Sequence, residues 1–293
     1  MTESGSLTAA QIVMTEPAAR PVGGLPIGSG RMGTLVWTTS GAIEFQINRV
    51  DVFAVNRHAA GAHFPGPADY GGGCARVSIA VGGDPFRAGP HFAQRLSLAD
   101  ARCEIRGEAV RAACWVAAED DVLVVEVTDE REAPAPIDVK LAMWREPEVG
   151  NGPHTAAYAF HQNRGGIAVV QTFREADHYC SSAVAIGAHW PGGEVTVPDE
   201  RTRILRLPAG RGARTILVAS ASSWDELDDA GAAAERILCR LAAPEARAAL
   251  ERGHRRWWQS FRQRTFVDIR SPDGSGEQAA RDRELFLYHM ACT

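Results

Sequence analysis

The sequence predicts a mainly β protein in which a large antiparallel sandwich is followed by α-helices. From about residue 34 to residue 222, β-rich runs alternate with Gly, Pro, Asp or Asn, and no helical period lies between them. Strands that follow one another without intervening helices favour an antiparallel sandwich over a βαβ fold. After residue 222 the pattern becomes mainly helical.

Composition excludes several classes of protein. The 293 residues suffice for one large domain or two ordinary ones, and a 45% hydrophobic content is typical of a globular protein with a sizeable core. Net charge is −5 and Lys140 is the only lysine, so we expect no nucleic-acid partner. Six scattered cysteines without a C-x-x-C pair predict neither a metal site nor a cofactor.

The sequence also bears on membranes and location. It has no run of about 18 apolar residues, so we expect no membrane span. The first residues lack a basic and apolar leader, which predicts a cytoplasmic protein as the chain is written. A secreted or periplasmic location stays open if the N-terminus is incomplete.

The first strands surround a glycine motif. Residues 28–33 read Gly-Ser-Gly-Arg-Met-Gly and fit the dinucleotide pattern G-x-G-x-x-G, which needs a strand before it and a helix after it. Upstream, Pro21, Pro26 and a Gly-Gly pair argue against a strand. Downstream, residues 42–48 alternate apolar and polar, which predicts a hairpin turning at residues 39–41. We therefore exclude a nucleotide site and expect the glycines to permit positive φ angles and close backbone approach.

The later strands follow the same signals. Val77, Ile79 and Val81 share one face, and residues 137–143 alternate apolar with mostly polar side chains. Five further β-rich runs cover residues 109–117, 121–129, 166–173, 181–190 and 213–222.

Three helices should follow the strands. The first has an acidic N-terminal turn and an apolar face through Ile237, and the second begins at Pro244. Trp257 and Trp258 share a face of the second helix and are expected in the core rather than in a sugar platform. The third helix begins near residue 276, and its end is so continuously apolar that we expect it to be buried on all sides. The sequence is then the front part of a longer protein whose missing part is helical.

Several segments together resemble bacterial glycoside hydrolase family 95 and related proteins. Residues 25–37, LPIGSGRMGTLVW, and 41–53, GAIEFQINRVDVF, are similar to a family turn of the form (L/M)P(I/L)GNGR(L/M)G and the hairpin that follows it. Ser29 stands where the family usually has Asn. The segments that resemble an uncharacterised branch of the same architecture are residues 92–105, 172–186, 254–261 and 285–292.

The resemblance implies a domain order. In that architecture an N-terminal β-supersandwich is joined by linker helices to an (α/α)6 barrel that carries the catalytic carboxylates. We therefore expect a β-sandwich domain at 1–222, linker helices at 223–265, and the start of a truncated barrel at 266–293. No catalytic residue is expected within these residues, although the full-length protein would be glycoside hydrolase-like. The expected partners are a carbohydrate substrate and the barrel of the same polypeptide.

Two stretches contain candidate substrate-binding side chains. The run from Arg174 to Cys180 places ionisable groups between two β-rich runs, where loops on a rigid sheet often bind ligands. The second stretch ends the first hairpin, where the related enzymes bring a loop toward the barrel, and continues into a Gly/Pro-rich loop. The alternative for residues 174–180 is a solvated loop or an internal ion-pair cluster. For residues 48–51 it is a turn in which Asn and Asp bond their own backbone, and for Tyr70 it is an aromatic ring packed on its own loop. The predicted residues are Asn48, Arg49, Asp51, Tyr70, Arg174, Glu175, Asp177 and His178.

Other functions stay open at this point. A stand-alone carbohydrate-binding or assembly module could use the terminal helix to dock on another chain. A polysaccharide lyase would combine similar domains, but the lyases usually place the helical part first, so the order here favours a hydrolase. His58 and His63 are five residues apart in a non-helical region, which makes a metal site a weaker alternative.

Overall fold

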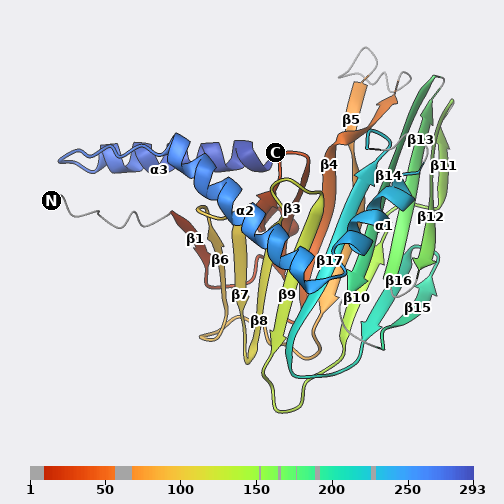
Figure 1. Cartoon of the computed structure of the whole chain (residues 1–293), viewed down its shortest axis with the longest axis horizontal. Coiled ribbons are helices and arrows are strands. Elements are labelled where there is room, and N and C mark those ends of the chain that lie inside the picture. Colours follow the sequence, from red (N-terminus) through yellow and green to blue (C-terminus); the bar gives the residue numbers. More distant parts are fainter. Residues whose placement is uncertain are drawn as a thin grey trace.

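The computed structural model describes residues 10–56, 68–151, 153–163, 166–175, 177–188, 192–225 and 229–293. These residues form two antiparallel sheets followed by three α-helices (Figure 1). The predicted fold class, a large antiparallel sandwich with helices after it, is confirmed. The main core lies between the sheets and is closed at one end by Trp258 and Tyr288 from the helices.

The larger sheet has ten strands, and its central strands are buried on both faces. Four consecutive residues from Val122 are buried, because one face packs against the second sheet and the other against helices. In spatial order its strands are β1 (Gln11–Met14), β6 (Ala93–Ser97), β7 (Arg102–Arg106), β8 (Val110–Val116), β9 (Val122–Asp129), β17 (Gly212–Ser222), β14 (His178–Ala188), β13 (Gly166–Glu175), β12 (His154–Asn163) and β11 (Glu148–Asn151).

The smaller sheet has seven strands and alternates clearly between its faces. Ile43, Phe45 and Ile47 are fully buried, whereas Glu44 and Gln46 between them are partly exposed. In spatial order its strands are β15 (Glu194–Asp199), β16 (Thr202–Leu207), β10 (Ile137–Ala142), β5 (Ala68–Ala80), β4 (Ala42–Asn56), β3 (Met32–Thr38) and β2 (Leu25–Gly28). The predicted hairpin turn at residues 39–41 is confirmed, because Thr39 N–H donates to the carbonyl of Ala42 at 3.0 Å.

The glycine motif joins β2 to β3, which corrects one expectation. A strand does precede the motif, although Pro26 argued against it, because β2 is the edge strand of its sheet and proline is tolerated there. A strand and not a helix follows, so the motif still fails the test for a nucleotide loop. Only Gly30 of the three glycines has a positive φ, 83°.

Gly28 does not have a positive φ, but it allows the end of the last helix to pack closely against the backbone. A Cβ atom there would lie 2.1 Å from the carbonyl oxygen of Cys292, at the end of the last helix. That helix is α3 (Ser275–Cys292), and the hydroxyl of its Tyr288 donates to the carbonyl of Pro26 at 2.7 Å. The absence of a side chain at Gly28 therefore lets α3 rest on the β2–β3 turn.

The first two helices cover the central part of the outer face of the ten-stranded sheet (Figure 1). α1 (Ala230–Arg240) is capped by the carboxylate of Asp229, which accepts from Ala232 N–H at 2.9 Å. It buries Ala230, Ala233 and Ala234 against small residues of the sheet. A short side chain at each contact allows the helix axis to lie close to the strands.

α2 (Pro244–Thr265) begins with proline at its first turn, as predicted. Trp258 is 1% exposed, which confirms the expected core position, and Trp257 stacks on Phe261 with ring centroids 5.4 Å apart. His254 lies 2.7 Å through Nε2 from the carbonyl of Asp100. Burial lowers the pKa of His254, so the neutral imidazole is the form that fixes α2 to the sheet.

α3 differs from its expected environment. Tyr288 and Cys292 are buried, but Phe286 is 62% and Met290 is 56% exposed, so the expectation of burial on all sides is wrong for the described structure. One face packs on the sandwich and the other does not. None of the described helices is long and apolar enough to cross a membrane.

Replacing Gly28 with alanine should lower the free energy of unfolding by about 1–3 kcal/mol, because the new methyl group overlaps the Cys292 carbonyl. Urea denaturation would measure the change. The matched control is Gly253→Ala inside α2, where the nearest atom to the new methyl is 4.0 Å away and helix propensity should add about 0.5–1 kcal/mol. Equal effects of the two substitutions would contradict the assignment.

Candidate functional site

The predicted substrate-binding residues fall on two parts of the described chain. Asn48, Arg49 and Asp51 lie on β4, and Tyr70 lies on the neighbouring strand β5. The remaining four surround the turn between β13 and β14, and they are Arg174, Glu175, Asp177 and His178.

The structure brings these two parts together where the sheets meet. His178 Nε2 lies 3.4 Å from the carbonyl oxygen of Phe53 near the end of β4, and the two rings stack with centroids 5.4 Å apart. Two residues further along β14, Cys180 Sγ lies 3.9 Å from the carbonyl oxygen of Asp51. β4 and the beginning of β14 belong to different sheets and therefore contact each other across the sandwich. This contact, which we call the β4–β14 edge of the sandwich, contains residues from both predicted stretches.

Arg49 occupies the centre of a buried ion network at this edge. Its side chain is fully buried, and its guanidinium donates to the carboxylates of Asp51, Asp121 and Asp225 at 2.6–2.9 Å. It also donates to the carbonyl of Ser220 at 3.0 Å. Each guanidinium nitrogen thus has an acceptor within the protein, so Arg49 is held as a fixed connection between strands.

Three members of the network were not predicted from the sequence. Asp121 comes from the turn between β8 and β9, Asp225 from the turn after β17, and Arg31 from the glycine turn. Arg31 pairs with Asp121 and, at 2.9 Å, with Asp225, and its side chain is half exposed. The network therefore contains two guanidinium groups and three carboxylates, and it joins the seven-stranded sheet to the ten-stranded sheet. No short-range pattern could have identified it, since its members are far apart in sequence.

Electrostatics fix the ionisation of this network. Burial alone would raise the pKa of Asp51, but the hydrogen bonds and charge of Arg49, with a further bond from Ser222, hold that pKa below its ordinary value. The carboxylates around Arg49 likewise outweigh its burial and raise its pKa. At neutral pH Asp51 is a charged acceptor and not a proton donor.

The β13–β14 turn presents a different set of groups. Glu175 is 1% exposed, and its Oε2 lies 3.5 Å from Nδ1 of His154 on the adjacent strand. Arg174 points outward, with its guanidinium 4.6 Å from the ring centre of Tyr179, which is 40% exposed. The inner residues stabilise the turn, while Arg174 and Asp177 are exposed on it.

A second polar group, also missed from the sequence, is centred on Gln171 of β13, four residues before the end of that strand. Gln171 is 1% exposed and donates to the carbonyl of Gly73 and to Ser182 Oγ, both at 2.9 Å. Its Oε1 accepts from Arg145 at 3.0 Å, and the Arg145 guanidinium lies 5.2 Å from the ring centre of Tyr158. Burial lowers the pKa of Arg145. Gln171 therefore links the two sheets behind the exposed residues of the turn.

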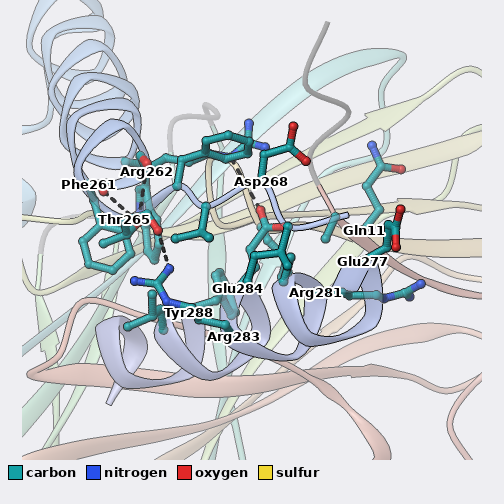
Figure 2. A pocket seen from close by; sticks show the side chains of 18 of the residues that line it. Gln11, Phe261, Arg262, Thr265, Asp268, Glu277, Arg281, Arg283, Glu284 and Tyr288 are labelled. Atoms are coloured by element: carbon teal, nitrogen blue, oxygen red, sulfur yellow. Dashed lines mark hydrogen bonds and ion pairs between the residues drawn. The ribbon is translucent and has the colours of Figure 1, made fainter. Parts of the chain in front are cut away.

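A separate cavity of about 620 Å³ lies between the end of α2, the segment 266–270 and α3 (Figure 2). Figure 2 shows Phe261 and Tyr288 on one side and Glu277 and Arg281 on the other. Arg283 crosses from α3 to donate to the carbonyl of Thr265. The cavity combines apolar walls with several charged groups.

No group of three His, Cys, Asp or Glu side chains suited to a metal ion occurs within the described part of the chain. His58 and His63, the weaker metal alternative, lie outside the described residues.

The two-sheet arrangement with helices after it also occurs in a solved structure of a larger protein. A protein from the human microbiome, named as a candidate kojibiose phosphorylase, matches 96% of this chain with a TM-score of 0.58 and 11% sequence identity. This chain covers 41% of that protein, so it spans about two fifths of its length.

Sequence comparison gives the family. Residues 13–177 match the family described as Domain of unknown function (DUF5703), and the chain belongs to that family. A family GH92 alpha-mannosidase from Bacteroides thetaiotaomicron is also similar, with 10% identity, 80% of this chain and 35% of that one covered, and a TM-score of 0.39. A search of curated proteins finds no match.

Replacing Arg49 with methionine should lower the free energy of unfolding by about 3–5 kcal/mol, because three carboxylates lose their buried counter-charge. Urea denaturation of the purified protein measures it. The matched control is Arg111→Met, which breaks an exposed pair with Glu130 and should cost about 0–1 kcal/mol. A loss for Arg49→Met no larger than that of the control would argue against a structural network.

The network should also give an acid-dependent stability. The folded-state pKa of Asp51 is below its unfolded value, so its contribution is present above the unfolded pKa of about 3.9 and is lost as pH falls through the folded pKa. Asp51→Asn should therefore be less stable than the wild type at pH 7, and the difference should shrink below about pH 4. Urea melts at a series of pH values test this, and a pH-independent difference would contradict it.

Proposed function

We propose that this chain is the N-terminal, non-catalytic sandwich and linker of a glycoside hydrolase-like carbohydrate-processing enzyme. The catalytic carboxylates would lie in an α/α barrel of the same polypeptide. The observation that carries the proposal is the match of 96% of this chain, sandwich and helices together, to a candidate kojibiose phosphorylase of which it covers 41%. The remaining length of that larger protein could contain a catalytic domain.

The exposed apolar side chains support a place for the barrel. Phe266, Val267 and Ile269 follow α2 and are each about two fifths exposed, and Phe286 and Met290 lie on the uncovered face of α3. Clustered exposed apolar groups are typical of a surface that another domain covers. We assign residues 1–222 to the sandwich, 223–265 to the linker and 266–293 to the first part of the barrel, which would pack against these side chains.

The predicted binding residues then divide by role. Arg49 and Asp51 connect β4 to the ten-stranded sheet, because their polar atoms bind each other and Asp121 or Ser222. Glu175 stabilises the turn through His154. The residues that we propose to contact sugar hydroxyls are Asn48, Tyr70, Arg174, Asp177 and His178.

The reaction would be completed in the barrel. Hydrolysis with inversion needs two carboxyl groups about 6.5–9.5 Å apart across the sugar, one as general acid and one as base for water. A phosphorylase transfers the glycosyl group to phosphate instead of water. In both cases the sandwich would shape one side of the substrate channel and bind the distal sugar.

The experiment compares the full polypeptide encoded by the gene with residues 1–293 alone. Both are incubated with kojibiose and with other gluco- and manno-disaccharides, with and without inorganic phosphate. We expect turnover only by the full polypeptide, and phosphate dependence separates phosphorolysis from hydrolysis. Equal turnover by residues 1–293 would overturn the proposal. A natural product that ends at residue 293 and binds glycans without turnover would instead support a stand-alone binding module.

Within an active full-length enzyme, Arg174→Ala should raise KM about tenfold with little change in kcat, because a charged hydrogen bond to substrate contributes about 1.5–3 kcal/mol. Steady-state kinetics on the best disaccharide measure both constants. The matched control is Arg87→Ala, an exposed arginine near the opposite end of β4, paired with Glu108. An equal KM for Arg174→Ala and wild type would remove Arg174 from the substrate site.

A further inference from the structure

The two sheets differ in how their outer faces are covered. Helices α1 and α2 pack on the ten-stranded sheet, whereas the outer face of the seven-stranded sheet carries no described helix. Exposed or half-exposed side chains from β3, β4, β5 and β10 form that face. A groove of about 400 Å³ lies across these four strands.

The floor of the groove is a row of directly paired residues. Trp37 is opposite Glu44, Glu44 is opposite Ser78, and Ser78 is opposite Lys140, so the four side chains cross four strands in register. Neighbouring strands are about 4.8 Å apart, so the row spans about 14 Å, enough for more than one sugar ring. Ser78 donates to Glu44 at 2.8 Å.

A second row and two walls complete the groove. Gln46 and Arg76 lie beside the first row and are 3.4 Å apart through Oε1 and Nε. Trp144 lies on the bare backbone of Gly73, where a Cβ atom would meet its indole ring at 2.6 Å, and it remains 41% exposed. On the opposite side the wall is the 3-10 turn η1 (Pro21–Gly23) with exposed Val22.

The chemistry of the lining indicates one class of ligand. Two indole rings offer flat apolar surfaces to the C–H faces of sugar rings, and the polar groups include both donors and acceptors, as hydroxyl groups require. Arg76 and Lys140 are balanced in part by Glu44, so the groove lacks the concentrated positive charge of a phosphate site. Burial raises the pKa of Glu44, against the opposing bond from Ser78, which is consistent with a partly desolvated site.

We propose that this groove is a glycan-binding site for a short neutral oligosaccharide, with sugar rings stacked on Trp37 and Trp144 and hydroxyls bonded to Glu44, Gln46 and Arg76. It goes beyond the proposed function, because its ligand class follows from its own lining and does not require a barrel. Asn48 lines the groove and is also one of the predicted substrate-binding residues on β4. A bound oligosaccharide could therefore extend from this face toward the β4–β14 edge.

The single lysine of the chain provides the test. Lys140 is exposed in the groove, and the N-terminal amine serves as the internal reference for the acetylation reaction. The protein is acetylated briefly with an amine-specific ester in the presence of maltotriose, cellotriose, xylotriose or mannotriose. Peptide mass spectrometry then measures the extent of acetylation at Lys140 and at the N-terminal amine. We expect at least one trisaccharide to slow acetylation of Lys140 more than threefold while the N-terminal amine is unaffected.

Variants show whether protection comes from the groove. Trp144→Ala and Glu44→Gln should each abolish protection, whereas Trp224→Ala, an exposed tryptophan outside the groove, should keep it. Circular dichroism confirms folding of each variant. Absence of protection by every trisaccharide, equal protection in Trp144→Ala, or protection by inorganic phosphate alone would overturn the proposal.

The outcome is distinct from that of the proposed function. Turnover by the full polypeptide with Lys140 unprotected would remove the groove and leave the enzyme proposal. Protection without any turnover would support the groove and count against the enzyme proposal.

Discussion

The buried guanidinium of Arg49 is the interaction on which the arrangement of the sheets depends. A charge removed from water is tolerated only when it is fully paired, and here carboxylates from three separate parts of the chain provide that pairing. One carboxylate belongs to β4 itself, one to a turn of the opposite sheet and one to the connection that leads into the helices. The same network therefore fixes the sheets to each other and to the turn after β17.

Much of the fold could be predicted because its signals are local. Alternation along residues 42–48 gave the hairpin, and Pro244 marked the start of α2. Pro26 misled because proline argues against a strand only when both edges of the strand must pair, and β2 is paired on one side. The exposed face of α3 could not be read from composition, because burial depends on which partners are present and not on hydropathy alone.

The site was less predictable than the fold. Asn48, Arg49 and Asp51 were predicted as the end of the first hairpin, but they lie within β4, which continues to Asn56. The partners of Arg49 are 72 and 176 residues further along the chain. The groove on the seven-stranded sheet was missed for a similar reason. Its floor is a row across strands, and Glu44, Ser78 and Lys140 look like ordinary outward-facing residues until the register aligns them.

The contact between Gly28 and Cys292 has a consequence for biosynthesis. Most of the sandwich lies between the two residues in the sequence, so the surface that the β2–β3 turn presents to α3 is made early and is covered only after the later strands have been synthesised. At about 5–20 residues per second, translation leaves this turn without its helix for on the order of 10–50 s. The strands of the sandwich can pair during that interval, and docking of α3 then closes a loop that contains most of the sandwich. A ribosome-bound nascent chain would thus hold an assembled sandwich with one uncovered end.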